Sequence, residues 1–159
     1  MTNQIMVKMA LDAWNAQLKN GNDLLEKLPD EQLMNEVAPG RNRGIYLLGH
    51  LIAVHDRMLP LLGLGEQLYP QLNEPFLKNP DNAKAAMPSA KELRQYWKNI
   101  NSTLADHFSK MQPDAWFQKH TSVSAEDFAK EPHRNKLNIL LSRTNHLSNH
   151  LGQLVFLKK

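Results

Sequence analysis

The chain has 159 residues, with 42% hydrophobic and 22% charged positions and a formal net charge of +3 at pH 7. This length and composition are typical of one globular domain, so we expect a single domain over residues 1–159 and exclude both disorder and a membrane protein. The absence of cysteine excludes disulfides, Cys-ligated metal sites and a thiol nucleophile supplied by the chain, and the lack of a basic block disfavours nucleic acid as a partner.

Two helices are predicted in the first 62 residues. Residues 5–28 repeat apolar or small side chains at intervals of three and four, which predicts one continuous helix through Gly21. A helical turn around 31–35 follows, and Asn42 is the expected N-cap of a second helix over 43–62. Pro60 lies near the end of that helix, where we expect it to kink or close the last turn.

A long irregular connection separates the second predicted helix from the third. Residues 63–88 contain four prolines and no sustained apolar periodicity. Connections of this length are unusual in compact domains and tend to be functional or to span the end of a bundle. We therefore predict a long crossover that joins two helices running in the same direction.

The second half of the chain predicts two further helices. Ser89 and Glu92 have the spacing of a capping box and begin an apolar repeat that continues to Met111. After a mixed stretch that includes one turn around Ser124, residues 134–157 place apolar side chains on a broad helical face. The expected fold is therefore all-α, a four-helix bundle with a long crossover connection between helices two and three.

The seven histidines are the candidate metal ligands, because imidazole is the remaining nitrogen ligand in a chain without thiols. His146 and His150 are four residues apart in the fourth predicted helix, so both side chains lie on one face and suit a shared metal ion. The HExxH zinc motif has the same spacing, but no glutamate follows the first histidine here, so the general base of that motif is missing.

His50 lies within the apolar part of the second predicted helix. A buried neutral imidazole needs a hydrogen-bond partner or a metal ion, since an unsatisfied polar ring is costly in an apolar environment. Together, His50, His146 and His150 would form a three-nitrogen site with positions left for water or substrate, which resembles catalytic zinc ligation. The alternative is a hydrogen-bonded core histidine beside a polar helix edge.

Two sequence runs carry a resemblance to a known family. YLLGHLIAVHDRML around His50, and NHLSNHLGQL with its HxxxHxGQ ending, resemble the DinB-like (YfiT-like) superfamily of metal-dependent enzymes. The resemblance covers nearly the whole chain, including the long connection. It implies that His50, His146 and His150 bind a divalent metal ion, zinc or nickel being the usual metals, in a pocket between the helices of the bundle.

The same resemblance implies an assembly state and two classes of reaction. Members of the superfamily are commonly homodimers. Those with an assigned reaction include transferases and isomerases that use small thiols such as bacillithiol or mycothiol, while the hydrolase label given to others is largely inferred. A small-molecule substrate, including a low-molecular-weight thiol, is therefore the expected partner.

Other polar residues are expected around the three histidines. Gln153 follows His150 by three positions, where its amide could orient the imidazole ring. Arg143 lies on the same flank of the fourth helix, and Arg57 lies on the second, so either could present positive charge to an anionic substrate. His55 is expected either beside the site or at the surface.

No catalytic base can be named from the sequence. Asp12, Asp56 and Asp106 have no fixed relation to the three histidines, and this counts mildly against hydrolysis. His120 and His133 lie in irregular segments and are expected to be solvated.

The leading hypothesis is a divalent-metal-dependent enzyme that activates water for hydrolysis or a small thiol for transfer. The alternative is a non-catalytic metal- or ligand-binding helical bundle related to stress. The first residues show no leader pattern, and no apolar run reaches about 18 residues, so we expect a cytoplasmic protein without a membrane partner.

Overall fold

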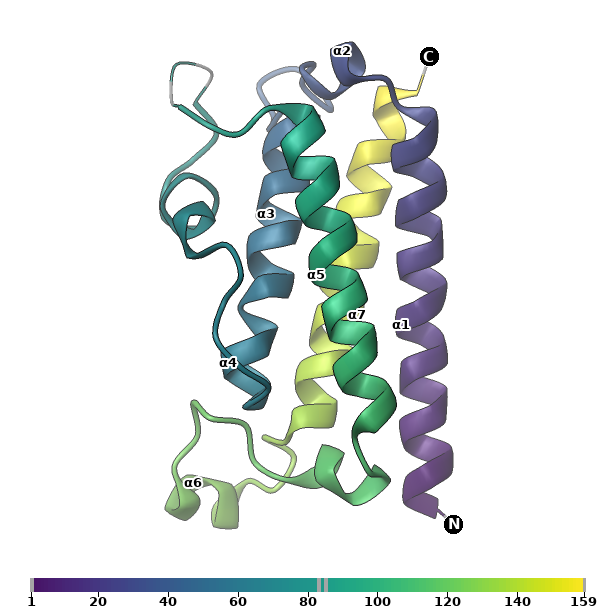
Figure 1. Cartoon of the computed structure of the whole chain (residues 1–159), viewed down its shortest axis with the longest axis vertical. Helices are drawn as coiled ribbons and strands as arrows, with labels where there is room; N and C mark the ends of the chain where they lie inside the picture. Colours follow the sequence, from purple (N-terminus) through teal and green to yellow (C-terminus); the bar gives the residue numbers. More distant parts are fainter. Residues whose placement is uncertain (1, 83, 85, 159) are drawn as a thin grey trace.

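The computed structural model describes residues 2–82, 84 and 86–158, and within them the regular structure is helical, which confirms the all-α prediction. Four long helices lie side by side (Figure 1): α1 (Thr2–Lys27), α3 (Gly44–Asp56), α5 (Ala90–Lys110) and α7 (Lys136–Leu154). The short elements are α2 (Asp30–Leu33), α4 (Met58–Leu62), the 3₁₀ turns η1 (Pro70–Leu72), η3 (Pro113–Phe117) and η4 (Val155–Leu157), the π turn η2 (Glu74–Lys78) and α6 (Ala125–Lys130).

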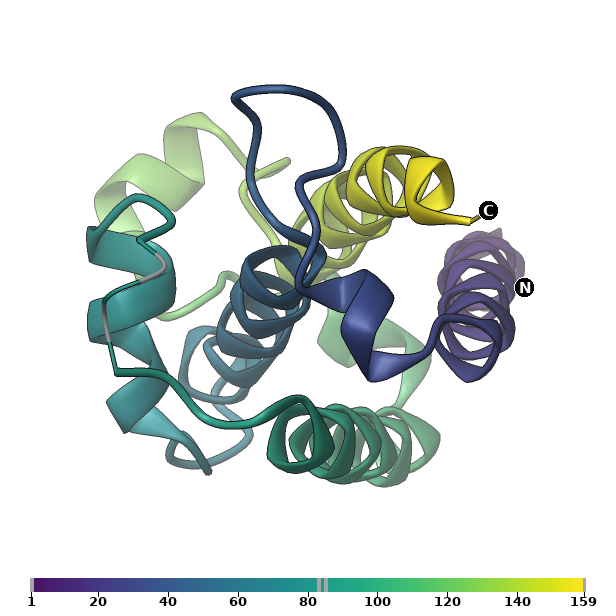
Figure 2. The ribbon, with the colours of Figure 1, turned by 90° about the horizontal axis from the view of Figure 1, so that it is seen from above.

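The helices form two pairs of opposite direction. In Figure 1, α1 and α7 run upward while α3 and α5 run downward, so the connection between α3 and α5 crosses the length of the molecule. Seen from above, α7 lies between α1 and α3 (Figure 2). The long crossover therefore joins helices of the same direction, as the sequence predicts, and the facing sides of α3 and α7 lie next to each other.

The second predicted helix is divided in two. The α-helix α3 ends at Asp56 and α4 begins at Met58, with Arg57 between them. Pro60 explains this break, because proline has no N–H to donate to the carbonyl of Asp56 four residues earlier and its ring crowds that carbonyl. The effect of Pro60 is thus one turn earlier than expected, and the chain finally leaves the helix at Gly63, which has a positive φ.

The start of α3 also differs from the prediction. Asn42 is not the N-cap: Arg43 holds that position and gives no side-chain cap. The backbone carbonyl of Asn42 instead accepts from the N–H of Val37, which closes the loop before α3. At α5 the prediction is confirmed, because Ser89 and Glu92 form a complete capping box.

The core lies between the apolar faces of the four long helices. Trp14 of α1 and Trp97 of α5 are almost fully buried. Gly21 lets α1 approach its neighbours closely, since a Cβ there would lie 3.3 Å from the Trp97 ring and 3.5 Å from Leu151. Gly44–Leu62, the one described stretch apolar and long enough to qualify as a membrane span, has 78% of its window buried inside the fold, as expected of a core helix.

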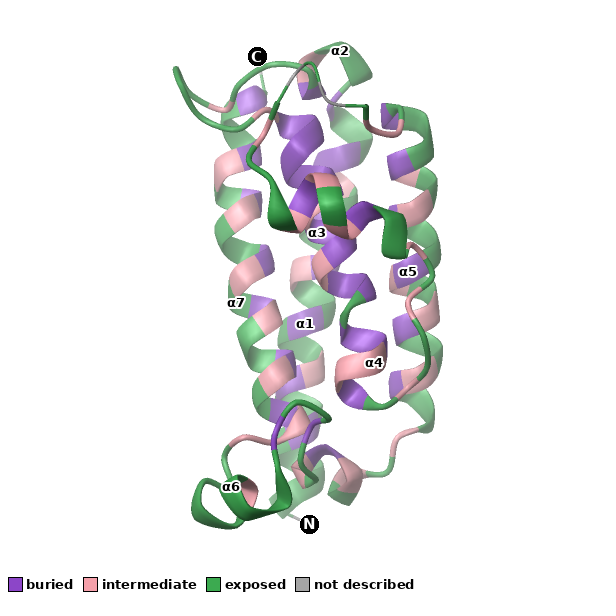
Figure 3. Ribbon diagram, turned by 90° about the vertical axis from the view of Figure 1, so that its left-hand side faces the viewer, coloured by how far each residue is buried: buried purple, intermediate pink, exposed green. Residues whose placement is uncertain are grey.

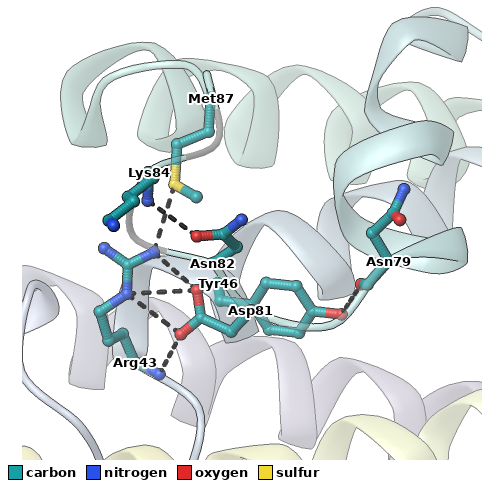
Figure 4. Close-up of polar contacts among 7 residues, drawn as sticks. All are labelled: Arg43, Tyr46, Asn79, Asp81, Asn82, Lys84 and Met87. Carbon is teal, nitrogen blue, oxygen red and sulfur yellow. Dashed lines mark hydrogen bonds and ion pairs between the residues drawn. The ribbon is translucent and has the colours of Figure 1, made fainter.

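The crossover is fixed to α3 by a group of polar contacts (Figure 4). Nη2 of Arg43 donates to Oδ1 of Asp81 at 2.6 Å, and the backbone N–H of Arg43 donates to Oδ2 at 2.8 Å. Burial alone would raise the pKa of Asp81, but these bonds outweigh it and lower that pKa. The hydroxyl of Tyr46 donates to the carbonyl of Asn79 at 2.7 Å. These bonds place residues 79–81 beside the first turn of α3.

An apolar contact completes this attachment one turn further along α3. The ring of Phe76 in η2 is fully buried and packs directly on Gly49. A Cβ on Gly49 would fall within the van der Waals envelope of that ring. The crossover can therefore lie this close to α3 only because position 49 carries no side chain.

His55 occupies a place that the sequence does not predict. It is fully buried, not at the surface, and its ring lies 4.9 Å from that of Trp14 and 5.2 Å from that of Trp97, measured between centroids. Its Nδ1 lies 2.8 Å from Oδ1 of Asn101. Burial lowers the pKa of His55 to about 3, so this ring is a neutral part of the core.

Replacing Gly49 with alanine should destabilise the fold, because the added methyl group would force the Phe76 ring and the crossover away from α3. We expect a loss of about 1–3 kcal/mol in the free energy of unfolding, measured by urea denaturation. Gly152→Ala in α7 is the matched control, since a Cβ at that exposed position meets no atom within 4 Å. The control should gain about 0.5–1 kcal/mol from helix propensity. Equal stabilities for the two variants would contradict the proposed packing.

The buried neutral state of His55 predicts a loss of stability in acid. Below its ordinary pKa of 6.5 the unfolded chain binds a proton at this residue, whereas the folded chain resists protonation down to about pH 3. Stability should therefore fall as the pH drops through this window, by about 1.4 kcal/mol per pH unit from this residue. Urea denaturation of His55→Gln, which keeps a partner for Asn101, should show a slope shallower by about that amount. Identical slopes would refute the assignment.

Candidate metal centre

Three imidazole rings meet between α3 and α7. His50 comes from the middle of α3, and His146 and His150 lie one turn apart on α7. Nε2 of His146 is 3.0 Å from Nε2 of His50 and 3.1 Å from Nε2 of His150. All three rings are half-buried, so the cluster lies at the edge of the core rather than inside it.

The outer nitrogens of two of these rings have acceptors as partners. Nδ1 of His50 lies 2.8 Å from the backbone carbonyl oxygen of Phe76, and Nδ1 of His150 lies 3.1 Å from Oε1 of Gln153. Each Nδ1 therefore carries the proton of a neutral ring and donates it. This fixes the tautomer, so that Nε2 of both rings is an unprotonated lone pair facing His146.

His146 cannot satisfy both neighbours. Its Nε2 holds at most one proton in the neutral ring and could donate to only one of the two lone pairs. Its Nδ1 is buried and has no hydrogen-bond partner within the described part of the chain. Burial lowers the pKa of His146 to about 4, and the nearby His150, His50 and Arg143 disfavour a positive charge there as well. At neutral pH His146 therefore does not take up a second proton that would let it donate to both neighbours.

A divalent cation would accept all three lone pairs at once. Nitrogen ligands bind zinc at about 2.0–2.1 Å, and two of them on one ion lie about 3 Å apart. The donor atoms present, their separations and the outer hydrogen bonds that fix two of the tautomers fit such an ion. The three histidines thus form a cluster that could bind a divalent metal, and no other group of this kind occurs among the described residues.

The remaining residues named from the sequence lie at different distances from this cluster. Gln153 contacts His150 directly, as described above. Arg143 precedes His146 by three residues on α7 and is close enough to lower the pKa of His146. Arg57 is exposed at the break after α3. Burial lowers the pKa of Arg143, and the positive charge of Arg57 lowers it further. The ring of His55 packs in the core against Trp14 of α1 and Trp97 of α5. Burial lowers its pKa against the opposing hydrogen bond with Asn101, and the side chains of His146 and His50 are close enough to lower that pKa further.

Two of the three candidate carboxylates, Asp56 and Asp12, are engaged elsewhere. Asp56 is fully buried and accepts the backbone N–H groups of Leu68 and Tyr69, which fixes the first part of the crossover. Asp12 pairs with Lys8 on α1. Among the described residues, the cluster that could hold a metal contains histidine alone.

Two features of this region were missed by sequence reasoning. The first is the backbone carbonyl of Phe76, which every residue type carries, so no side chain in the sequence indicates it. The one local sign of a close approach to α3 is Gly49, next to His50. His120, expected to be solvated, is buried, and its Nδ1 accepts from the N–H of Ser122. His133 is exposed, as predicted.

Comparisons with known proteins agree with the fold and show the family. No curated protein matches the chain. A conserved protein from Enterococcus faecalis has a similar solved structure, with a TM-score of 0.65 and 14% sequence identity over 94% of this chain and 93% of that one, a likeness that shows the fold alone. The family model of the DinB superfamily matches residues 13–154. The chain therefore belongs to the DinB superfamily.

Proposed function

We propose that this protein is a divalent-metal-dependent enzyme, with His50, His146 and His150 as the metal ligands and zinc or nickel as the ion. The observation that carries the proposal is the convergence of three Nε2 atoms, two of which are fixed as lone pairs by their Nδ1 partners. Membership of the DinB superfamily, whose members are metal-associated, supports the same interpretation.

The chain's own residues would prepare this site before any substrate arrives. The Phe76 carbonyl and the Gln153 amide hold two of the rings in the orientation that directs Nε2 inward. Outer partners of this kind keep the ligand tautomer fixed and raise the basicity of the binding nitrogen. When bound, the ion would act as a Lewis acid that lowers the pKa of a water molecule or small thiol and so supplies a nucleophile near neutral pH.

The surroundings favour thiol transfer over hydrolysis. Hydrolysis usually requires a positioned group that removes a proton from water, and two of the carboxylates named from the sequence, Asp12 and Asp56, are bound to other partners. A small thiol is more acidic than water and needs less assistance, with the metal as the main activator. We therefore propose a thiol-dependent transferase, with a metal-dependent hydrolase as the second arm of the test.

Metal binding should require each of the three histidines. Purified untagged protein, loaded with zinc or nickel and dialysed, is expected to retain about one ion per chain by inductively coupled plasma mass spectrometry. His50→Ala, His146→Ala and His150→Ala should each lose the ion while keeping the helical circular dichroism spectrum. His133→Ala is the matched control, because it removes an exposed histidine outside the cluster. A wild-type protein without metal would overturn the proposal.

Turnover should depend on the bound ion. Metal-loaded protein is expected to consume small thiols in the presence of an electrophilic acceptor, measured as the loss of free thiol. This activity should disappear after chelation and in His150→Ala. Activated esters serve as substrates for the hydrolase arm. Stoichiometric metal without turnover in either arm would contradict the enzyme assignment and favour a non-catalytic metal-binding protein.

A further inference from the structure

A cavity of about 280 Å³ lies next to the histidine cluster. Val54 on α3, Leu77 in η2 and Arg143 on α7 form three of its walls. Val54 follows His50 by four residues, Arg143 precedes His146 by three, and Leu77 follows Phe76, whose carbonyl contacts His50. Residues three or four apart on a helix share a face, so the cavity begins about one turn from His50 on α3 and from His146 on α7.

The other walls come from segments that are remote in sequence. Arg57, Pro60 and Leu61 extend the floor from the break after α3 into α4, and Thr121 and Ser122 close the far side. The hydroxyl of Thr121 donates to the carbonyls of Pro60 and Leu61 at 3.0 and 3.2 Å, which holds this loop against α4. In Figure 3 this region lies between α4 and the lower half of α7.

The charge of this cavity is entirely positive. Arg57 and Arg143 are the charged residues that line it, and no aspartate or glutamate is among the lining residues. Neither arginine forms an ion pair with another described residue, and Nε of Arg143 is buried without a hydrogen-bond partner there. Burial lowers the pKa of Arg143, and repulsion by the like charge of Arg57 lowers it further.

Arg143 is half-buried and has no carboxylate partner among the described residues, which is costly unless an anion joins it. The exposed Arg57 adds a second positive charge at the edge of the same cavity. Guanidinium groups match carboxylate and phosphate oxygens with two parallel N–H donors, and the hydrogen bonds are strengthened by the opposite charges. The arrangement of Arg57 and Arg143 thus has the chemistry of an anion site.

We propose that this cavity binds the anionic group, a carboxylate or phosphate, of the small molecule on which the histidine cluster acts. The inference rests on the proposed function and names its substrate class. At about 280 Å³ the cavity is slightly smaller than the usual range for drug-sized ligands, so it accommodates the charged end of a small molecule. The walls formed by Val54, Leu61 and Leu77 are apolar. The reacting end of the molecule would extend toward His50 and His146, one turn away.

The anion site can be tested without the metal. Chelator-treated, ¹⁵N-labelled protein is titrated with inorganic phosphate in one arm and malonate in the other, at constant ionic strength. Saturable shifts of the backbone amide signals of Val54, Leu77 and Ser122 are expected. The arm with the tighter binding identifies phosphate or carboxylate as the preferred group, and either result supports the site.

Substitution of the arginines should weaken this binding. Arg143→Gln and Arg57→Gln are each expected to raise the dissociation constant about tenfold, because each removes a charge-assisted pair of hydrogen bonds. Lys91→Gln on α5 removes one positive charge from another face of the molecule and should leave the dissociation constant unchanged. Arg143→Lys, which keeps the charge but not the planar fork, should be intermediate and guards against a folding defect in Arg143→Gln.

Two outcomes would overturn the inference. One is the absence of saturable shifts at the cavity amides in both arms, and the other is unchanged binding in Arg143→Gln and Arg57→Gln. Because the protein is metal-free in this experiment, its result is independent of the metal analysis. A protein that binds metal but no anion refutes only the substrate class, whereas one that binds anion but no metal refutes only the proposed function.

Discussion

The contact of the crossover with Gly49 and His50 joins the fold of this chain to its chemistry. Phe76 uses its ring to fill the space that Gly49 leaves and its carbonyl to accept from His50. A side chain at position 49 would separate the two segments and remove the partner that fixes the His50 tautomer. The ion pair of Arg43 with Asp81 holds the same segment at its other end. The long connection is therefore a structural part of the candidate metal centre.

The electrostatics of the candidate centre follow from its ligand set, which contains no carboxylate among the described residues. The three candidate ligands are neutral imidazoles, and the nearest charged side chain on α7 is Arg143. An ion held by neutral ligands keeps its full charge, which then dominates the local field. Anionic ligands and nucleophiles gain from such a field, whereas cationic molecules are repelled. The positive cavity beside the cluster extends this preference beyond the reach of the ion itself.

Local sequence patterns predicted the features that depend on local physics. The apolar repeats gave the long helices, the Ser89 and Glu92 spacing gave the α5 cap, and the four-residue interval placed His146 and His150 on one face. Contacts between remote segments were beyond reach. Nothing near His50 names Phe76 as its partner, and His55 is neutral and buried because Trp14 and Trp97, remote in sequence, enclose it. The end of α3 at Asp56 could have been placed by counting four residues back from Pro60.

His50 and His146 are 96 positions apart in the sequence, so the candidate centre forms only when two remote helices pack together. Helices α1, α3 and α5 precede α7 along the chain, and the donor set is incomplete until α7 packs against α3. An ion that binds only when all three histidines are in place stabilises the folded chain by an amount that grows with the logarithm of its concentration relative to its dissociation constant. The last helix would then be held by two independent forces, apolar burial against α1 and coordination against α3.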